Sequence, residues 1–183
     1  MNTSPAHLAS AVIQFWCEEL RPEQHWQKDP KLDRHIAERF GKLRDEVLRT
    51  RAEGWRDTPE TLAAAIILLD QFSRNMFRGS AKAFEADPLA LELCKEALAK
   101  GWVDQVRKPL PSFMLMPLQH SENLEDQERS VAEFQGRDPL NYKYALLHRD
   151  QIRRFGRFSG RNQALGRVST PEEREVIARG ETF

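Results

Sequence analysis

The sequence is poor in the features that mark secreted or membrane-bound proteins. It has only two cysteines, Cys17 and Cys94, in 183 residues. Two thiols can form at most one disulfide, which is too few to stabilise a chain of this length, so we expect both to be reduced. No apolar run reaches the length of a membrane span, and the first residues lack the basic and apolar regions of a signal peptide. These absences predict a cytoplasmic protein with no membrane partner.

An excess of charge of either sign is also missing. The chain has 28 basic and 28 acidic residues, and its formal net charge is zero. Proteins that bind nucleic acid need a basic surface to meet the phosphates. The balance argues against a nucleic acid partner, and RNA binding by the arginine-rich segment 153–167 is the weakest of the hypotheses considered.

Strand signals are absent, whereas helix starts are frequent. No alternation of apolar and polar residues flanks a Gly–Asn or Asp–Gly turn. Six prolines follow Ser, Thr or Asp, and a capping side chain before a proline at the first helical position starts a helix. The six are Ser4–Pro5, Asp29–Pro30, Thr58–Pro59, Asp87–Pro88, Asp138–Pro139 and Thr170–Pro171. The last pair also begins a capping box that Glu173 completes.

Apolar residues recur after these starts with the spacing of one helix face. The three clearest stripes are Leu32, Ile36, Phe40, Leu43 and Val47; Ala90, Leu91, Cys94 and Leu98, before Gly101; and Leu140, Tyr144, Leu147, His148, Ile152 and Phe155. We expect further helices over 124–134 and over 110–120, the latter bent or ended by Pro117. The pattern predicts one all-α domain over 1–183. It has seven or eight helices in a right-handed superhelix or an irregular bundle.

The first candidate site residue is Asp70. It follows a segment, 62–69, that is apolar on every side and should be buried on every side. Arg74 lies one helical turn later and can pair with it. The pair either fixes the end of a helix or holds a carboxylate ready for a ligand. Asn75 and Arg78 extend this polar segment.

A second candidate group is His120–Ser121–Glu122. Histidine and glutamate at this spacing could ligate a metal or act as an acid/base pair. Alternatively, Ser121 or Asn123 caps the next helix and His120 bonds to backbone. No His–Glu–x–x–His motif or cysteine cluster accompanies the group, so we predict no metal and no cofactor. His148 lies on an apolar face, which is typical of a hydrogen-bonded core histidine.

The third group is the arginine-rich segment 153–167, which contains no acidic residue. Its arginines could bind a phosphate or a carboxylate, or they could pair with internal acids such as Asp70 and Glu122. A solvated charged face is the third alternative, which the interleaved Phe155 and Phe158 disfavour for Arg157 and Arg161. Arg161–Asn162 repeats the Arg74–Asn75 pair, and we expect both segments to face one polar interior. The candidate ligand-binding residues are Asp70, Arg74, Asn75, Arg78, His120, Ser121, Glu122, His148, Arg157, Arg161, Asn162 and Arg167.

The chain as a whole resembles a known family. The motifs are Phe15–Trp16, Trp26, DQFSRNMFRG, AFEADPLAL, FMLMPLQHSENLEDQ and RRFGRFSGRNQALGR. Together, over about residues 10–178, they resemble the bacterial domain of unknown function 924. The resemblance implies an all-α, tetratricopeptide-like (TPR-like) superhelix and implies no reaction. The chain departs from the family at Ser73, where proline is usual, and at Ser159–Gly160, where Pro–His is usual.

Two functions follow from these observations. A TPR-like fold favours a binding module for a peptide or protein partner. The alternative is a protein that binds an anionic small molecule, or an enzyme, with Arg74, Arg157 and Arg161 as anion ligands and His120 or Glu122 as acid or base. The chain has no Gly–x–Ser–x–Gly motif and no phosphate-binding glycine loop, so the sequence assigns no reaction.

Overall fold

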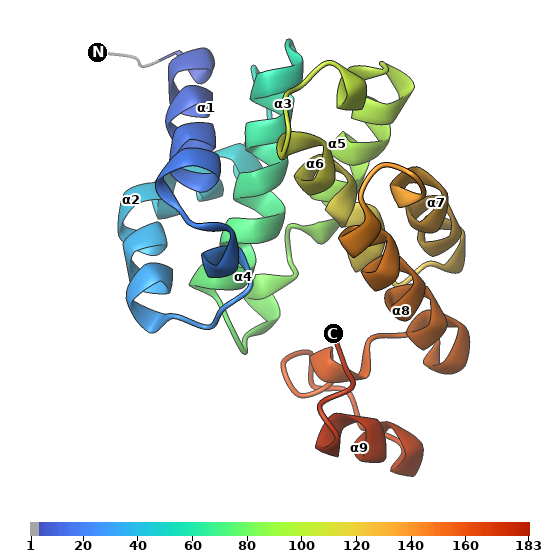
Figure 1. Cartoon of the computed structure of the whole chain (residues 1–183). Helices are drawn as coiled ribbons and strands as arrows, with labels where there is room; N and C mark the ends of the chain where they lie inside the picture. The colour runs from blue at the N-terminus through green and yellow to red at the C-terminus, as the bar shows by residue number, and fades with distance from the viewer. Residues whose placement is uncertain (1–3) are drawn as a thin grey trace. The chain divides into compact units, whose positions relative to one another are not determined.

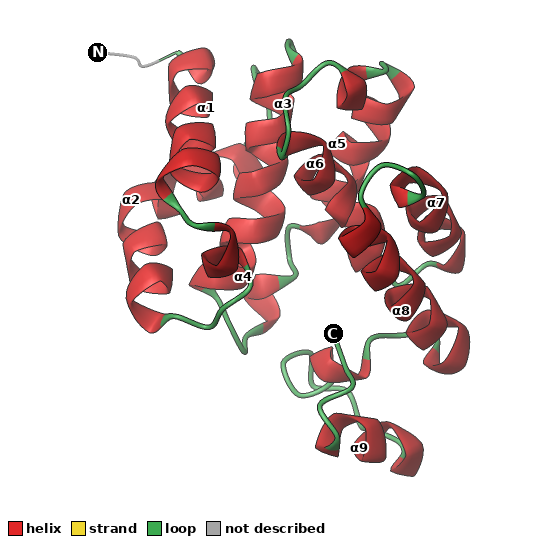
Figure 2. Ribbon diagram, in the orientation of Figure 1, coloured by secondary structure: helices red, strands yellow, loops and turns green. Residues whose placement is uncertain are grey.

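The computed structural model describes residues 4–183 as helices joined by loops, with no strand in that range (Figure 1, Figure 2). Contacts divide the chain into two compact units. The first comprises the described residues up to Arg78 together with Lys82–Pro117, and the second comprises Gly79–Ala81 and Leu118–Phe183. Over the described residues, no helix is both long and apolar enough to span a bilayer.

The helices follow the predicted order. They are α1 (Pro5–Gln14), α2 (Pro30–Arg49), α3 (Pro59–Ile66), α4 (Ser73–Met76), α5 (Asp87–Ala99), α6 (Leu110–His120), α7 (Leu124–Phe134), α8 (Pro139–Phe155) and α9 (Pro171–Ala178). A π-helical segment, Ile67–Phe72, joins α3 to α4. If these three segments are counted as one helix, residues 4–183 contain eight, as the sequence predicts.

Most of the predicted helix starts are confirmed. The side chains of Ser4, Asp29, Thr58, Asp138 and Thr170 each accept a backbone N–H from the first turn of the following helix. A helix also starts at Asp87–Pro88, but the capping role predicted for Asp87 is wrong, because α5 begins at Asp87 itself and Ala86 occupies the capping position without a side-chain bond. The Asp87 carboxylate pairs with Arg74 instead.

The ends of the helices are also close to expectation. α7 has the predicted bounds, and Gly101 follows α5 in the left-handed conformation, with φ of 65°. Pro117 does not end α6, which continues to His120. Pro117 has no N–H for the carbonyl of Phe113, so α6 continues past it with one intrahelical hydrogen bond fewer.

The core of the first unit surrounds α3. Every residue from Leu62 to Asp70 is fully buried. A second π-helical segment, Phe15–Glu19, follows α1 and packs against the first, with the Trp16 and Phe72 ring centroids 5.3 Å apart. In α2 the sequence prediction needs a correction, because Arg44 rather than Leu43 is buried alongside Phe40 and Val47.

In the second unit α7 and α8 lie side by side (Figure 1). Phe134, Ala145, Ile152 and Phe158 are buried in its core. The stripe predicted on α8 is only partly buried. His148 and Ile152 point into the core, whereas Leu140, Tyr144 and Leu147 are 56%, 42% and 45% exposed. These three residues, spaced i, i+4 and i+7, lie on one side of the helix, and we call them the α8 stripe.

Candidate functional site

In the first unit, Asp70 forms an internal ion-pair network. Its carboxylate is fully buried, and its Oδ1 lies 3.0 Å from Nη1 of Arg74. The same guanidinium donates to both carboxylate oxygens of Asp87, at 2.9 and 3.0 Å. Burial lowers the pKa of Arg74, but the charges of Asp70 and Asp87 outweigh burial and raise it. The predicted i, i+4 pair is therefore present, and it holds the helix around Asp70 to α5.

Asn75 and Arg78 form a separate network with Asp33 of α2. Asn75 Nδ2 donates to the Asp33 carboxylate at 2.8 Å, and Arg78 donates two bonds at 2.9 Å. Burial raises the pKa of Asp33, but these hydrogen bonds lower it by more. Sequence reasoning missed Asp33, which lies in the first turn of α2 beside the buried Leu32.

Arg44 is another buried charge that the sequence analysis missed. Its Nε donates to Ser73 Oγ at 2.9 Å, and its Nη1 lies 2.7 Å from a carboxylate oxygen of Glu85. Ser73 stands at a position where the family resemblance implies a proline. A proline there would offer no hydroxyl to this guanidinium.

In the second unit, Glu122 is the centre of a polar cluster. Arg167 donates two bonds to its carboxylate, at 2.8 and 3.0 Å, and the backbone N–H of Phe158 donates a third at 2.8 Å. Burial raises the pKa of Glu122, but these bonds and the charges of Arg167 and Arg161 lower it below its ordinary value. The carboxylate therefore stays ionised and holds the loop after α8 to the loop before α7.

The residues around Glu122 also have internal contacts. Arg161 is buried, donates to the backbone oxygen of His120 at 2.9 Å and lies 4.5 Å from the ring centroid of Phe158. His148 bonds to the Tyr144 carbonyl through Nδ1, at 2.8 Å, as expected of a core histidine. The His120 and His148 ring centroids are 6.2 Å apart.

Ser121 and Asn123 form hydrogen bonds with the first turn of α7. Ser121 Oγ donates to the Asp126 carboxylate at 2.7 Å, and the Asn123 side chain accepts the backbone N–H groups of Glu125 and Asp126. The alternative in which one of these residues caps a helix is thus correct for Asn123. No group of three or more metal-ligating side chains occurs within residues 4–183.

Arg157 and Asn162 lie near a carboxylate that the sequence analysis assigned only to a capping box. Glu173 is 1% exposed and accepts bonds from Arg157 Nε and Nη2, at 2.7 and 2.8 Å, and from Thr170 N at 2.8 Å. Arg157 above all, with help from Thr170, lowers the pKa of Glu173 to about 2. Asn162 is buried beside it and donates to Ser169 Oγ at 3.0 Å.

Comparison with known proteins identifies the family but not the activity. The model of a family described as a bacterial protein of unknown function (DUF924) matches residues 12–181. The chain belongs to the DUF924 family. A solved structure of a protein of unknown function from Agrobacterium tumefaciens is similar, with 36% identity and a TM-score of 0.92 over 97% of this chain and 100% of that chain. No curated protein matches the sequence.

For this DUF924 chain, the candidate residues fall into two groups. Asp70, Arg74, Asn75 and Arg78 belong to the first unit, and the other eight belong to the second. Within the second unit the structure gathers His120, Glu122, His148, Arg161 and Arg167 around Phe158. That the two Arg–Asn segments face one interior stays a prediction.

Replacing Arg161 by alanine is expected to lower the free energy of unfolding by about 2 kcal/mol, because the His120 carbonyl loses a charged donor and the buried ring of Phe158 loses its contact with the guanidinium. The exposed Arg153, which pairs with Glu128, is the matched control, and its alanine variant should change stability by less than about 0.5 kcal/mol. Urea denaturation of both variants measures the difference. Equal stabilities would mean that Arg161 is not a structural residue of this DUF924 chain and would favour a ligand role.

Proposed function

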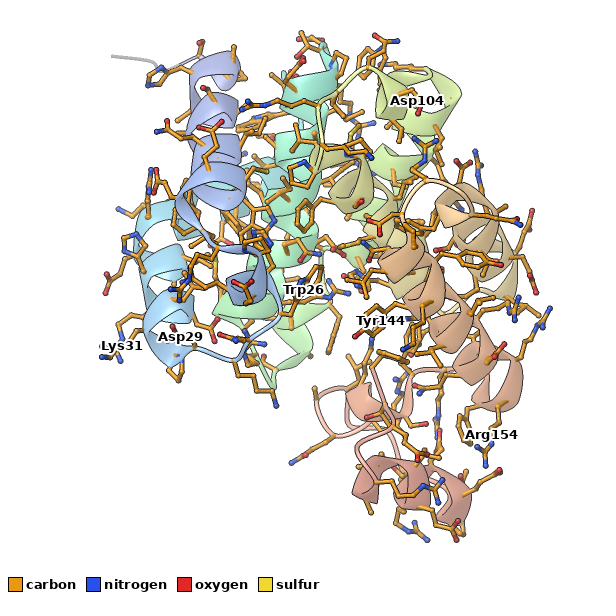
Figure 3. The ribbon with its side chains drawn as sticks, in the orientation of Figure 1. Trp26, Asp29, Lys31, Asp104, Tyr144 and Arg154 are labelled. Carbon is orange, nitrogen blue, oxygen red and sulfur yellow. The ribbon has the colours of Figure 1, made fainter. Side chains whose placement is uncertain are left out.

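We propose that this protein is a binding module for a partner protein and that it contacts a peptide segment of that partner through the α8 stripe. The observation that carries the proposal is the exposure of Leu140, Tyr144 and Leu147, each above 40%. Single exposed apolar residues are common, but three at i, i+4 and i+7 form a continuous apolar surface. Figure 3 shows Tyr144 on the side of α8 that lies away from α7.

The dimensions of this surface suit a peptide. Three anchors over two helical turns extend about 10 Å along α8, comparable with the anchors that hold a peptide in helix-in-groove recognition. The stripe continues into a cavity of about 390 Å³ between α8 and α9, since Leu147 belongs to both. A peptide could place one side chain in the cavity and lie along the stripe.

The charged candidate residues give less support to the alternative function, the binding of an anionic small molecule. Arg74, Arg78, Arg157 and Arg167 each bind a carboxylate of their own unit. An added phosphate or carboxylate would have to displace those internal carboxylates. Each of them either accepts two hydrogen bonds from its arginine or is itself buried. This favours a structural role for the arginines and a binding role for the apolar surface.

Selection from a random peptide library on the immobilised protein tests the proposal. The triple variant Leu140→Ser, Tyr144→Ser, Leu147→Ser should bind the selected peptides at least 30-fold more weakly, because three anchors of roughly 1 kcal/mol or more are removed. The control Leu124→Ser, Val168→Ser removes exposed apolar residues elsewhere in the unit and should leave binding unchanged. Equal loss in both variants, or loss in neither, would contradict the proposal.

We also infer a TPR-like right-handed superhelical arrangement and a cytoplasmic location. The resemblance of the motifs and the pairwise packing of helices adjacent along the chain, such as α7 with α8, support the first. The low cysteine content supports the second.

A further inference from the structure

The 180–183 segment forms one wall of the cavity at the end of the α8 stripe. Opposite it are apolar side chains of α8 and α9, namely Leu147, Phe155 and Val176, together with Gln151. Residues 181–183 adopt no regular secondary structure. Gly180 and Glu181 close the end of α9, since their N–H groups bond to the carbonyls of Ile177 and Val176. The chain then passes the side of α8 where we place a partner peptide.

Its contacts are of the kind by which proteins hold extended peptides. Gln151 Nε2 donates to the main-chain oxygen of Glu181 at 3.0 Å. The ring of Phe183 stacks on His148, with centroids 3.8 Å apart and planes inclined by 23°. His148 in turn meets Phe158 edge-on at 5.5 Å. The Gln151 amide thus binds the backbone of the segment, and the His148 ring binds one aromatic side chain by stacking.

Gly160 completes this site by leaving room for main chain. A Cβ at this position would lie 2.7 Å from the oxygen of Phe183 and 2.9 Å from Thr182 Oγ1. Both distances are shorter than van der Waals contact, so a larger residue would push the segment away. The absence of a side chain at Gly160 is therefore what admits the main chain of residues 182–183.

Only the NH₂ group of the Gln151 amide has a hydrogen-bond partner. Gln151 is 7% exposed, and its Oε1 is buried without a hydrogen-bond partner. A glutamine amide can pair with both the C=O and the N–H of an extended peptide, because it carries an acceptor beside its donors. The 180–183 segment supplies only the C=O. A peptide that supplied both groups would match the site better than the chain's own segment does.

From these contacts we propose that residues 180–183 occupy the position of an extended partner peptide with an aromatic side chain, and that such a peptide must displace them to bind. The inference rests on the proposed function and deepens it, since it gives the chemistry of the ligand and a form of self-inhibition. An occupied site lowers the apparent affinity for a peptide, which equals the intrinsic affinity multiplied by the fraction of molecules in which the site is open.

The test is binding of a fluorescein-labelled peptide of sequence ARGETF, residues 178–183, followed by fluorescence anisotropy on the full chain. The peptide is amidated so that no terminal charge enters the contact. Phe183 is a third exposed, so Phe183→Ala should leave the fold intact, which circular dichroism checks. We expect this variant to bind the peptide at least tenfold more tightly than the wild type, because its own segment competes less well.

Two controls define the contacts. The peptide ARGETA should bind neither protein, since it lacks the ring that stacks on His148. Adding Gln151→Leu to Phe183→Ala should weaken binding of ARGETF at least fivefold, since the leucine keeps most of the volume and removes the amide. Equal affinity of wild type and Phe183→Ala, or tight binding of ARGETA, would overturn the inference.

The library selection separates this inference from the proposed function. If the α8 stripe variant loses its selected peptides while Phe183→Ala changes no affinity, the binding function stands and self-occupancy is wrong. If neither the stripe variant nor Phe183→Ala has an effect, both are wrong. A tenfold gain in Phe183→Ala that the stripe variant leaves intact supports the 180–183 site and overturns the role of the stripe.

Discussion

Replacing Arg74 by alanine is expected to destabilise the protein by about 3–5 kcal/mol, the typical cost when one partner of a buried ion pair is removed. Asp70 is fully buried, and Arg74 lies 3.0 Å from it on the next turn of the helix. The variant leaves this buried carboxylate without its guanidinium, and the neutral amide of Gln71, 2.6 Å from Oδ2, cannot replace the lost charge. Chemical denaturation at pH 7 measures the loss directly.

Two further variants show whether the charge is the cause. Arg49→Ala removes an arginine that pairs with Glu46, and both partners are more than half exposed, so stability should change by less than about 0.5 kcal/mol. Adding Asp70→Asn to Arg74→Ala should restore part of the lost stability, because the buried charge is gone. If Arg74→Ala were within about 1 kcal/mol of the wild type, the network around Asp70 would not be structural.

Glu173→Gln is expected to remove about 3 kcal/mol of stability at neutral pH. In the folded chain the pKa of Glu173 falls from 4.5 to about 2, chiefly because Arg157 donates to its carboxylate. A carboxyl group with a lowered folded-state pKa stabilises the protein fully above its unfolded-state pKa. Its contribution is therefore complete above about pH 4.5 and is lost as the pH falls towards 2.

Denaturation series at pH 7, 5, 4 and 3 follow this dependence. The difference between wild type and Glu173→Gln should be largest at pH 7 and should shrink below pH 4.5. Glu172→Gln is the matched control, since Glu172 is the neighbouring, exposed partner of Arg154 and its replacement should change stability by less than about 0.5 kcal/mol. A constant difference at all four pH values would mean that the charge of Glu173 is not what stabilises α9.

The sequence predicted most of the local structure because the signals that start a helix are local. A capping oxygen and a proline need only their own neighbours, so five of the six predicted caps are confirmed. Asp87 failed because its carboxylate has a better partner in Arg74, thirteen residues earlier. That competition depends on how α5 packs and leaves no pattern in the residues around Asp87.

The charge pairs were harder to predict for the same reason. The Asp70–Arg74 pair follows from helical spacing alone. The partners of Arg157, Arg167 and Arg44 come from 16, 45 and 41 residues away. The same limit applies to the α8 stripe, since helical spacing shows that Leu140, Tyr144 and Leu147 share a side but not whether another element covers it.

The capped helix starts have a consequence for changes in the length of the chain. The start of α8 is encoded in Asp138 and the three residues after it, which carry the cap and the proline. Residues inserted after Gly136 would move this start together with the helix, and a longer loop adds only a little closure entropy. The loops can therefore grow or shrink between related chains while each helix that begins with such a cap keeps its first turn.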